Sequence, residues 1–341
     1  MDIDEVKQLL AKGQAHFSKG KWAEASKELA KAKAALDKMK LDPDGKMVLS
    51  EVLQLKAFAE TRRGQYRIAL QAAERSVEIS RSIGDLMGET EALRTIGYIF
   101  WLKGDLTKAS DLLDEALVKA KDCDAKALIG KIKIEQGNVI ASQWQYEEAK
   151  ELYREAAKIL KHENSLPDLS RAYNNLGFML LLQKKHKEAV SALKTAMDLA
   201  DQAGDTRIKN MAALNAAECF VALGNHDVAA EMLGPVTEAM LEFDDKAGIA
   251  SAYRIYGMIY TVTKQWPKAE TYFRKAFALV KVAGNPEMEG AICKEYGRMF
   301  IAKGDKERAR VKLSEAYEVY KKLGVKDKAA DVQQILKLTQ D

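Results

Sequence analysis

Residues 172–200 read AYNNLGFMLLLQKKHKEAVSALKTAMDLA, and the pattern of apolar residues in this stretch indicates the fold. Apolar side chains from Tyr173 to Leu180 recur at the spacing of one helical face. After the polar break at 183–186, apolar side chains from Ala189 to Leu199 do so again. The stretch therefore predicts two amphipathic helices joined by a short turn.

Small residues recur every forty positions along the chain. Alanine stands at 69, 109, 149, 189, 229, 269 and 309, and glycine at 97, 137, 177, 257 and 297. Ala25 fits the same series if Leu41-Asp-Pro-Asp-Gly45 contains a four-residue, turn-rich insertion. All of the 21 glycines except Gly45 and Gly234 keep a periodic position. This spacing predicts a repeat protein.

The period divides the chain into eight helical hairpins and a cap. We expect one domain over residues 1–341, with a terminal helix that covers the last repeat. The apolar face of Ala329, Val332 and Leu336 predicts this capping helix over about 326–339. The predicted repeats span about 6–49, 50–89, 90–129, 130–169, 170–209, 210–249, 250–289 and 290–329.

The periodic glycines have a packing reason. In the series at 97, 137, 177, 257 and 297, each glycine stands twelve residues before a periodic alanine, and a bulky residue such as Tyr153 or Phe273 stands four residues after that alanine. We expect the two helices of a hairpin to cross closely here, where an oversized side chain would cost about 1–3 kcal/mol. Gly234-Pro235 instead predicts a local kink in the second helix of the sixth unit.

This Gly, aromatic, Ala, Leu/Phe, Ala series on paired helices resembles the tetratricopeptide repeat (TPR) over about residues 6–329. The forty-residue period is similar to that of kinesin light chain and LGN-type adaptors, and Tyr-Asn-Asn-Leu-Gly at 173–177 is similar to their first helix. The resemblance implies an all-α fold: a right-handed superhelical solenoid of about eight TPR helix-turn-helix repeats plus a C-terminal capping helix.

Composition and charge disfavour some classes of function. With 54 Lys+Arg against 50 Asp+Glu, the net charge of +4 provides no basic field of the kind that nucleic-acid binding needs. The near-apolar stretch Ile96–Leu102 is too short to span a membrane. Three widely separated cysteines indicate a reducing compartment. We therefore expect a cytoplasmic protein without membrane insertion or direct nucleic-acid binding.

The chain shows no pattern of catalytic chemistry. It contains no phosphate-binding loop, dinucleotide fingerprint, hydrolase elbow or His-Glu-x-x-His zinc helix. His186 and His226 occupy a position that holds Trp or Tyr in other units, so they are expected to pack. Cys219 and Cys293 have apolar neighbours and are expected to be buried. We predict no catalytic residue, cofactor or metal site, and no enzyme.

The resemblance implies a concave groove lined by the first helix of each unit. Asparagine amides would hold a peptide backbone, arginines would meet carboxylates, and aromatic or methionine side chains would form anchor pockets. The Lys/Asn/Asn/Lys/Arg set of carboxylate-clamp TPR domains is not reproduced. The predicted peptide-binding residues are Arg94, Tyr98, Trp101, Asn138, Arg171, Asn174, Asn175, Phe178, Asn215, Arg254, Met258, Lys294 and Arg298.

Three functions stay open for such an array. The first is a non-enzymatic scaffold that binds a peptide segment of a protein partner in the groove. The second is a peptide-sensing regulator, because bacterial quorum-sensing regulators use similar arrays. The third is a self-assembling scaffold, which would form a homo-oligomer.

Overall fold

A computed structural model describes residues 3–18, 20–242 and 244–339. Within these ranges all regular structure is helical, which confirms the predicted all-α fold. The helices are α1 Ile3–Ser18, α2 Trp22–Leu36, α3 Pro43–Arg62, α4 Tyr66–Ile83, α5 Leu86–Leu102, α6 Leu106–Asp122, α7 Lys126–Ser142, α8 Tyr146–His162, α9 Leu166–Leu182, α10 His186–Gln202, α11 Thr206–Ala222, α12 His226–Glu242, α13 Lys246–Val262, α14 Trp266–Ala283, α15 Pro286–Lys303, α16 Lys306–Lys322, α17 Lys326–Leu336 and the 3₁₀ turn η1 Lys337–Thr339.

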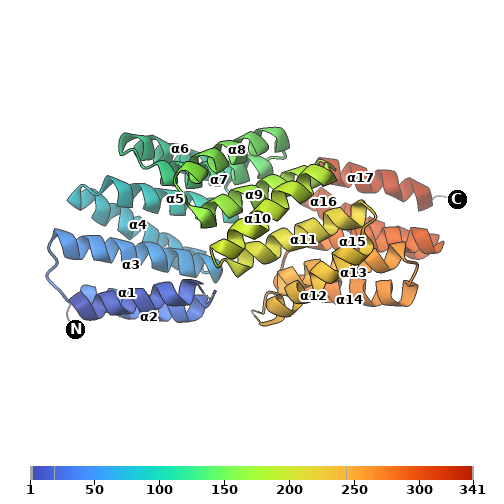
Figure 1. The fold of residues 1–341 in the computed structure, drawn as a ribbon, viewed down its shortest axis with the longest axis horizontal. Helices are drawn as coiled ribbons and strands as arrows, with labels where there is room; N and C mark the ends of the chain where they lie inside the picture. Colours follow the sequence, from blue (N-terminus) through green and yellow to red (C-terminus); the bar gives the residue numbers. More distant parts are fainter. Residues whose placement is uncertain (1–2, 19, 243, 340–341) are drawn as a thin grey trace. The chain divides into compact units, whose positions relative to one another are not determined.

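The chain forms two compact units, and the helices of each pack in sequence order (Figure 1). Unit 1 comprises Met1–Met179 and Asp198–Ile208, and unit 2 comprises Leu180–Met197 and Lys209–Asp341. Within unit 1 the hairpins α1/α2, α3/α4, α5/α6 and α7/α8 pack against one another. Within unit 2, α13/α14 and α15/α16 do the same, and α17 packs on α16 as a cap. A single array over 1–341 stays a prediction.

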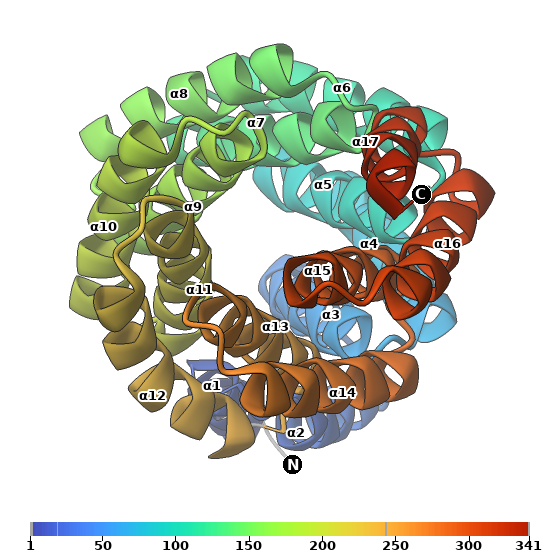
Figure 2. The ribbon, with the colours of Figure 1, turned by 90° about the vertical axis from the view of Figure 1, so that its right-hand side faces the viewer.

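First and second helices take different sides of each unit. In unit 1, α5 and α7 lie on the inner side of the helix layer, and α6 and α8 lie on the outer side (Figure 2). In unit 2, α13 and α15 are inner, and α14 and α16 are outer (Figure 2). The inner helices therefore carry the faces on which a ligand is expected.

Helix ends follow the predicted turn positions. Gly84 closes α4 with a φ of 71°, and the Asp85 side chain accepts a hydrogen bond of 2.9 Å from the backbone N–H of Gly88 to cap α5. Trp144 and Lys184 take the same left-handed conformation with φ of 66° and 60°. The repeat geometry therefore imposes this turn even where glycine is absent.

The close helix crossing is present where the periodic glycines predicted it. A Cβ atom at Gly137 would lie 2.6 Å from Cε1 of Tyr153, and one at Gly257 would lie 2.8 Å from Cε1 of Phe273. Carbon atoms cannot approach this closely without displacement of the neighbouring ring. Glycine on the first helix thus makes room for the large side chain of the second. Elsewhere, α12 continues through Pro235, and a kink there stays a prediction.

Replacing Gly137 with Ala should lower the free energy of unfolding by about 1–3 kcal/mol, because the new methyl group overlaps the Tyr153 ring. In a Tyr153→Ala background the same change should add little cost, since the ring is gone. Urea denaturation of the four proteins in this cycle measures the coupling. An equal cost in both backgrounds would show that the crossing contact is not what requires glycine.

Candidate functional site

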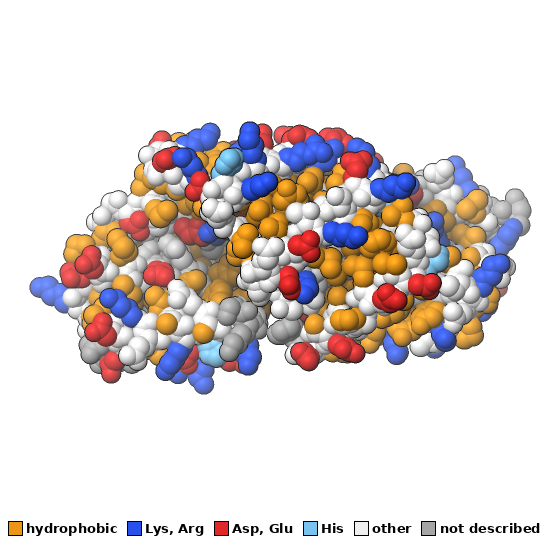
Figure 3. All heavy atoms as spheres, viewed as in Figure 1, with side chains coloured by type: hydrophobic (Ala, Val, Ile, Leu, Met, Phe, Trp, Pro, Cys, Tyr) orange, Lys and Arg blue, Asp and Glu red, His pale blue; other side chains and the backbone are white. Residues whose placement is uncertain are grey.

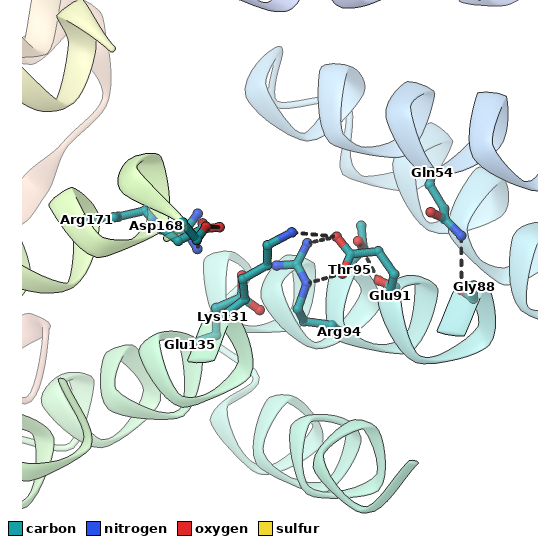
Figure 4. Close-up of polar contacts among 10 residues, drawn as sticks. Gln54, Gly88, Glu91, Arg94, Thr95, Lys131, Glu135, Asp168 and Arg171 are labelled. Atoms are coloured by element: carbon teal, nitrogen blue, oxygen red, sulfur yellow. Dashed lines mark hydrogen bonds and ion pairs between the residues drawn. The ribbon is translucent and has the colours of Figure 1, made fainter. Parts of the chain in front are cut away.

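The inner wall of unit 1 carries a buried network of charged side chains centred on Arg94 of α5. The Arg94 Nη2 and Nε atoms donate to Glu91 at 2.7 and 3.1 Å, and its Nη1 atom donates to Glu135 of α7 (Figure 4). Lys131 of α7 forms a further ion pair with Glu91 at 4.0 Å. The predicted groove residue Arg94 is thus 7% exposed and joins two first helices.

Burial and charge act in opposite directions on the acids of this network. Burial raises the pKa of Glu91, but Arg94 and Lys131 outweigh it and lower that pKa to about 2. Burial also raises the pKa of Glu135, and here it outweighs the opposing effect of Arg94 and Arg171. Glu135 Oε2 is buried and accepts no hydrogen bond from a described residue. The network therefore stabilises the wall but contains one unsatisfied carboxylate oxygen.

Three of the predicted asparagines lie together. Asn138 of α7 accepts hydrogen bonds through Oδ1 from Tyr153 of α8 at 2.8 Å and from Asn175 of α9 at 2.9 Å. Asn174 donates to Asn175 at 3.2 Å and is 2% exposed. These amides are largely occupied in joining α7, α8 and α9, so the geometry suits them to hold the inner wall in place.

Two of the aromatic side chains predicted for the groove, Tyr98 and Trp101, lie together near the end of α5. The rings of Tyr98 and Trp101 lie 5.5 Å apart, and Trp101 donates its indole N–H to Ser142 of α7 at 2.8 Å. Arg62, at the end of α3, lies over the Phe58 ring at 4.9 Å and 5.9 Å from the Tyr98 ring. Arg62 was not predicted, because it lies outside the helix positions expected to face the groove.

Unit 2 contains a hollow of about 220 Å³ lined by residues of α11, α12, α13 and α15. Arg254 of α13 lines this hollow and donates to Glu218 of α11 through two parallel hydrogen bonds of 3.0 and 2.5 Å. Burial raises the pKa of Glu218, but the charge and hydrogen bonds of Arg254 bring it below its ordinary value. The hollow is lined by Met211, Leu214, Asn215, Glu218, Met240, Asp245, Ala247, Gly248, Ser251, Arg254, Ile255 and Met288.

The structure brings only some of the predicted residues together. Arg254 and Asn215 line the hollow, and Met258 lies beside it because its sulfur is 3.5 Å from Arg254 Nη1. Lys294 is paired with Asp331 of α17 at 3.3 Å. Phe178 and Arg298 are the most open, with Phe178 39% exposed and the Arg298 side chain 58% exposed. A role for any of them in ligand binding stays a prediction.

The described residues contain few features of other kinds of site. They contain no group of three or more His, Cys, Asp or Glu side chains placed to hold a metal ion. None of the described helices combines the length and apolarity needed to cross a membrane. Cys219 and Cys293 are fully buried, as predicted, and burial raises the pKa of each thiol to about 12. On the face drawn in Figure 3, Lys and Arg side chains are interspersed with Asp and Glu.

Comparison with known proteins supports the assignment of the repeat. The family profile described as tetratricopeptide repeat matches residues 129–202 and 168–242. A search of curated proteins gives no significant match.

Solved structures of similar fold include peptide-bound and ligand-free proteins. The Rap conjugation gene regulator of plasmid pLS20 with the Phr* peptide has a TM-score of 0.65 at 14% identity, covering 98% of this chain and 97% of that one. A Rap protein complexed with competence and sporulation factor has a TM-score of 0.61 at 14% identity, and the match covers 99% of this chain and 98% of that one. The apo form of the quorum sensor NprR from B. thuringiensis has a TM-score of 0.61 at 16% identity, and the match covers 92% of this chain and 87% of that one. The chain therefore has the fold of a tetratricopeptide-repeat helical solenoid, with the repeat itself matched over residues 129–242.

Replacing Glu91 with Gln should destabilise the protein most at neutral pH. The folded pKa of about 2 lies below the ordinary 4.5, so the stabilisation is complete above about 4.5 and is lost as the pH falls through about 2. Urea denaturation should show a gap of about 1–3 kcal/mol between wild type and variant at pH 7 that narrows toward pH 3.

Glu78→Gln is the matched control, because Glu78 forms an exposed ion pair with Arg75 and should change stability by less than about 1 kcal/mol. A Glu91→Gln gap that stayed constant or widened on acidification would contradict the assigned role of the Arg94 network.

Proposed function

We propose that the protein binds a peptide segment of a partner along the inner faces of its first helices, without catalysing a reaction. The observation that carries this proposal is the hollow in unit 2, because it combines flexible apolar side chains with an oriented ion pair. A pocket of this kind accepts one side chain of a ligand and offers polar groups to its backbone.

Methionines give the hollow its apolar character. Met211, Met240 and Met288 come from α11, α12 and α15, so three elements contribute unbranched thioether side chains. Such side chains adjust to irregular shapes, which suits the recognition of a peptide anchor. Ser251 holds Met288 through a contact of 3.7 Å between its hydroxyl and the sulfur.

The Arg254–Glu218 pair fixes the polar side of the hollow. The Arg254 and Glu218 side chains are 12% and 25% exposed, so the pair is partly shielded from water but still reaches the hollow. Asn215 adds an amide that can both donate and accept. The proposed ligand is a peptide that places an apolar side chain among the methionines and backbone groups near Asn215 and Arg254.

Two finer assignments belong to this proposal. We place the chain with TPR arrays of the forty-residue type, on the support of the period in the sequence. We place the protein in the cytoplasm, on the support of three cysteines that form no disulfide. A peptide-sensing regulator is the alternative function, supported by the fold shared with the Phr*-bound Rap regulator, and it would use the same inner face.

Panning a phage-displayed random dodecapeptide library against the whole chain tests the proposal. Peptides recovered above background should bind wild type, and replacing Met211 or Met288 with Ala should weaken them about tenfold, the usual effect of losing a central anchor contact. Titration calorimetry measures the affinities.

Val311→Ala on the outer helix α16 is the matched control, because Val311 is 54% exposed and its helix lies on the other side of the unit. Its affinity should equal that of wild type. Failure to recover any peptide, or equal loss of affinity in all three variants, would contradict peptide binding on the inner face.

A further inference from the structure

The hollow in unit 2 carries more negative than positive charge. Its charged lining residues are Glu218, Asp245 and Arg254. Arg254 donates to Glu218 through Nη1 at 3.0 Å and through Nη2 at 2.5 Å, so this base and this acid neutralise each other. Asp245 has no basic partner among the described residues, and it therefore gives the hollow a net negative charge.

Asp245 uses one carboxylate oxygen to cap α13 and leaves the other available. Its Oδ1 atom accepts a hydrogen bond of 2.9 Å from the backbone N–H of Gly248. Its Oδ2 atom forms no hydrogen bond or ion pair with a described residue. The N-terminus of a helix carries only about half a positive charge, so the full negative charge of the carboxylate outweighs it. The Oδ2 atom can therefore accept a hydrogen bond from a cation.

A thioether lies beside this second oxygen. A Cβ atom at Gly248 would lie 2.5 Å from the sulfur of Met240 and 2.7 Å from Asp245 Oδ2, so the sulfur and the oxygen border the same point. Glycine leaves that point open. Met240 is 3% exposed and belongs to the core of unit 2. A cation that reaches Asp245 from within the hollow must therefore be carried by an apolar chain that packs on methionine.

The length of the hollow favours a long, unbranched side chain. Gly248 and Arg254 both line it and are six residues apart on α13, which corresponds to about 9 Å along the helix axis. A ligand backbone near Arg254 thus needs a side chain of several carbon atoms to bring a charge to Asp245. Lysine has such a flexible alkyl chain, which can lie on apolar surface while its ammonium binds elsewhere. Its point charge suits a single carboxylate oxygen, whereas the arginine fork is matched to two.

We infer that the hollow binds a lysine side chain of the peptide ligand, with its alkyl chain against the methionines and its ammonium on Asp245 Oδ2. This inference rests on the proposed function and names the anchor, because the apolar part of the ligand in the hollow is then the alkyl chain of lysine. A buried ammonium is costly unless it is paired with an acid. Asp245 therefore sets the preference for lysine over an uncharged side chain of similar length.

The peptides recovered by panning on the wild-type chain test the inference. They should share a lysine at one position. Each is synthesised with acetylated and amidated ends, once with this lysine and once with norleucine, which keeps an alkyl chain but lacks the ammonium. Titration calorimetry should show that wild type binds the lysine form at least about tenfold more tightly. Because both ends are capped, the peptide N-terminus cannot supply the cation.

Asp245→Asn separates the charge from the helix cap, because asparagine caps helices about as well as aspartate. This variant should bind the lysine form about tenfold more weakly than wild type does and the norleucine form equally well. Asp85→Asn is the matched control, because Asp85 accepts the same capping bond of 2.9 Å from the backbone N–H of Gly88 in unit 1. It should bind both forms as wild type does.

The outcomes separate this inference from the proposed function. Recovered peptides without a shared lysine would overturn the lysine inference and leave peptide binding standing. So would an Asp245→Asn variant that binds the lysine form as tightly as wild type, or one that loses affinity equally for both forms. Failure to recover any peptide would overturn both the lysine inference and the proposed function.

Discussion

The close crossing of the two helices in each hairpin is the contact on which the rest of the structure depends. At Gly137 and Gly257 the first helix has no side chain, and the ring of Tyr153 or Phe273 from the second helix lies where a Cβ atom would be. This contact fixes which face of each first helix is buried within its own hairpin. The remaining face must then pack on the next hairpin or stay open on the inner side.

The remaining faces of the first helices carry different side chains in the two units. In unit 1 several polar side chains pair with one another: Arg94 donates to Glu135, and Asn175 donates to Asn138. In unit 2 the Arg254–Glu218 pair borders a methionine-lined hollow. The same repeat thus carries a buried charge network in unit 1 and a methionine-lined hollow in unit 2. Arg62 and Arg171 each contact a neighbouring side chain, yet some of their N–H groups form no hydrogen bond with a described residue.

Much of the fold could be predicted from sequence because its causes are local. These local features are the left-handed turns at Gly84 and Gly204, the caps at Asp85 and Asp205, and the space at Gly137. Each depends on residues that are close in sequence or within one hairpin.

The candidate site depends instead on contacts between side chains of different hairpins. Arg94 pairs with an acid 41 residues later, and Asn175 pairs with an amide 37 residues earlier. These separations are one residue more and three residues fewer than the repeat period. The repeat period indicates which helices are adjacent, but side-chain length and burial determine which side chains form hydrogen bonds. For that reason Asn174, predicted to contact ligand, is buried in the wall, and Arg62 was missed.

On the proposed function, the inner faces of the first helices bind the ligand. Photo-crosslinking tests it most directly: a recovered peptide carrying a benzophenone side chain is irradiated on the whole chain, and the labelled residues are located by mass spectrometry. Labels are expected on inner helices such as α5 and α7 in unit 1 or α13 and α15 in unit 2, and they should be lost on competition with unlabelled peptide. Competable labels confined to the outer helices α6, α8, α14 and α16 would contradict it.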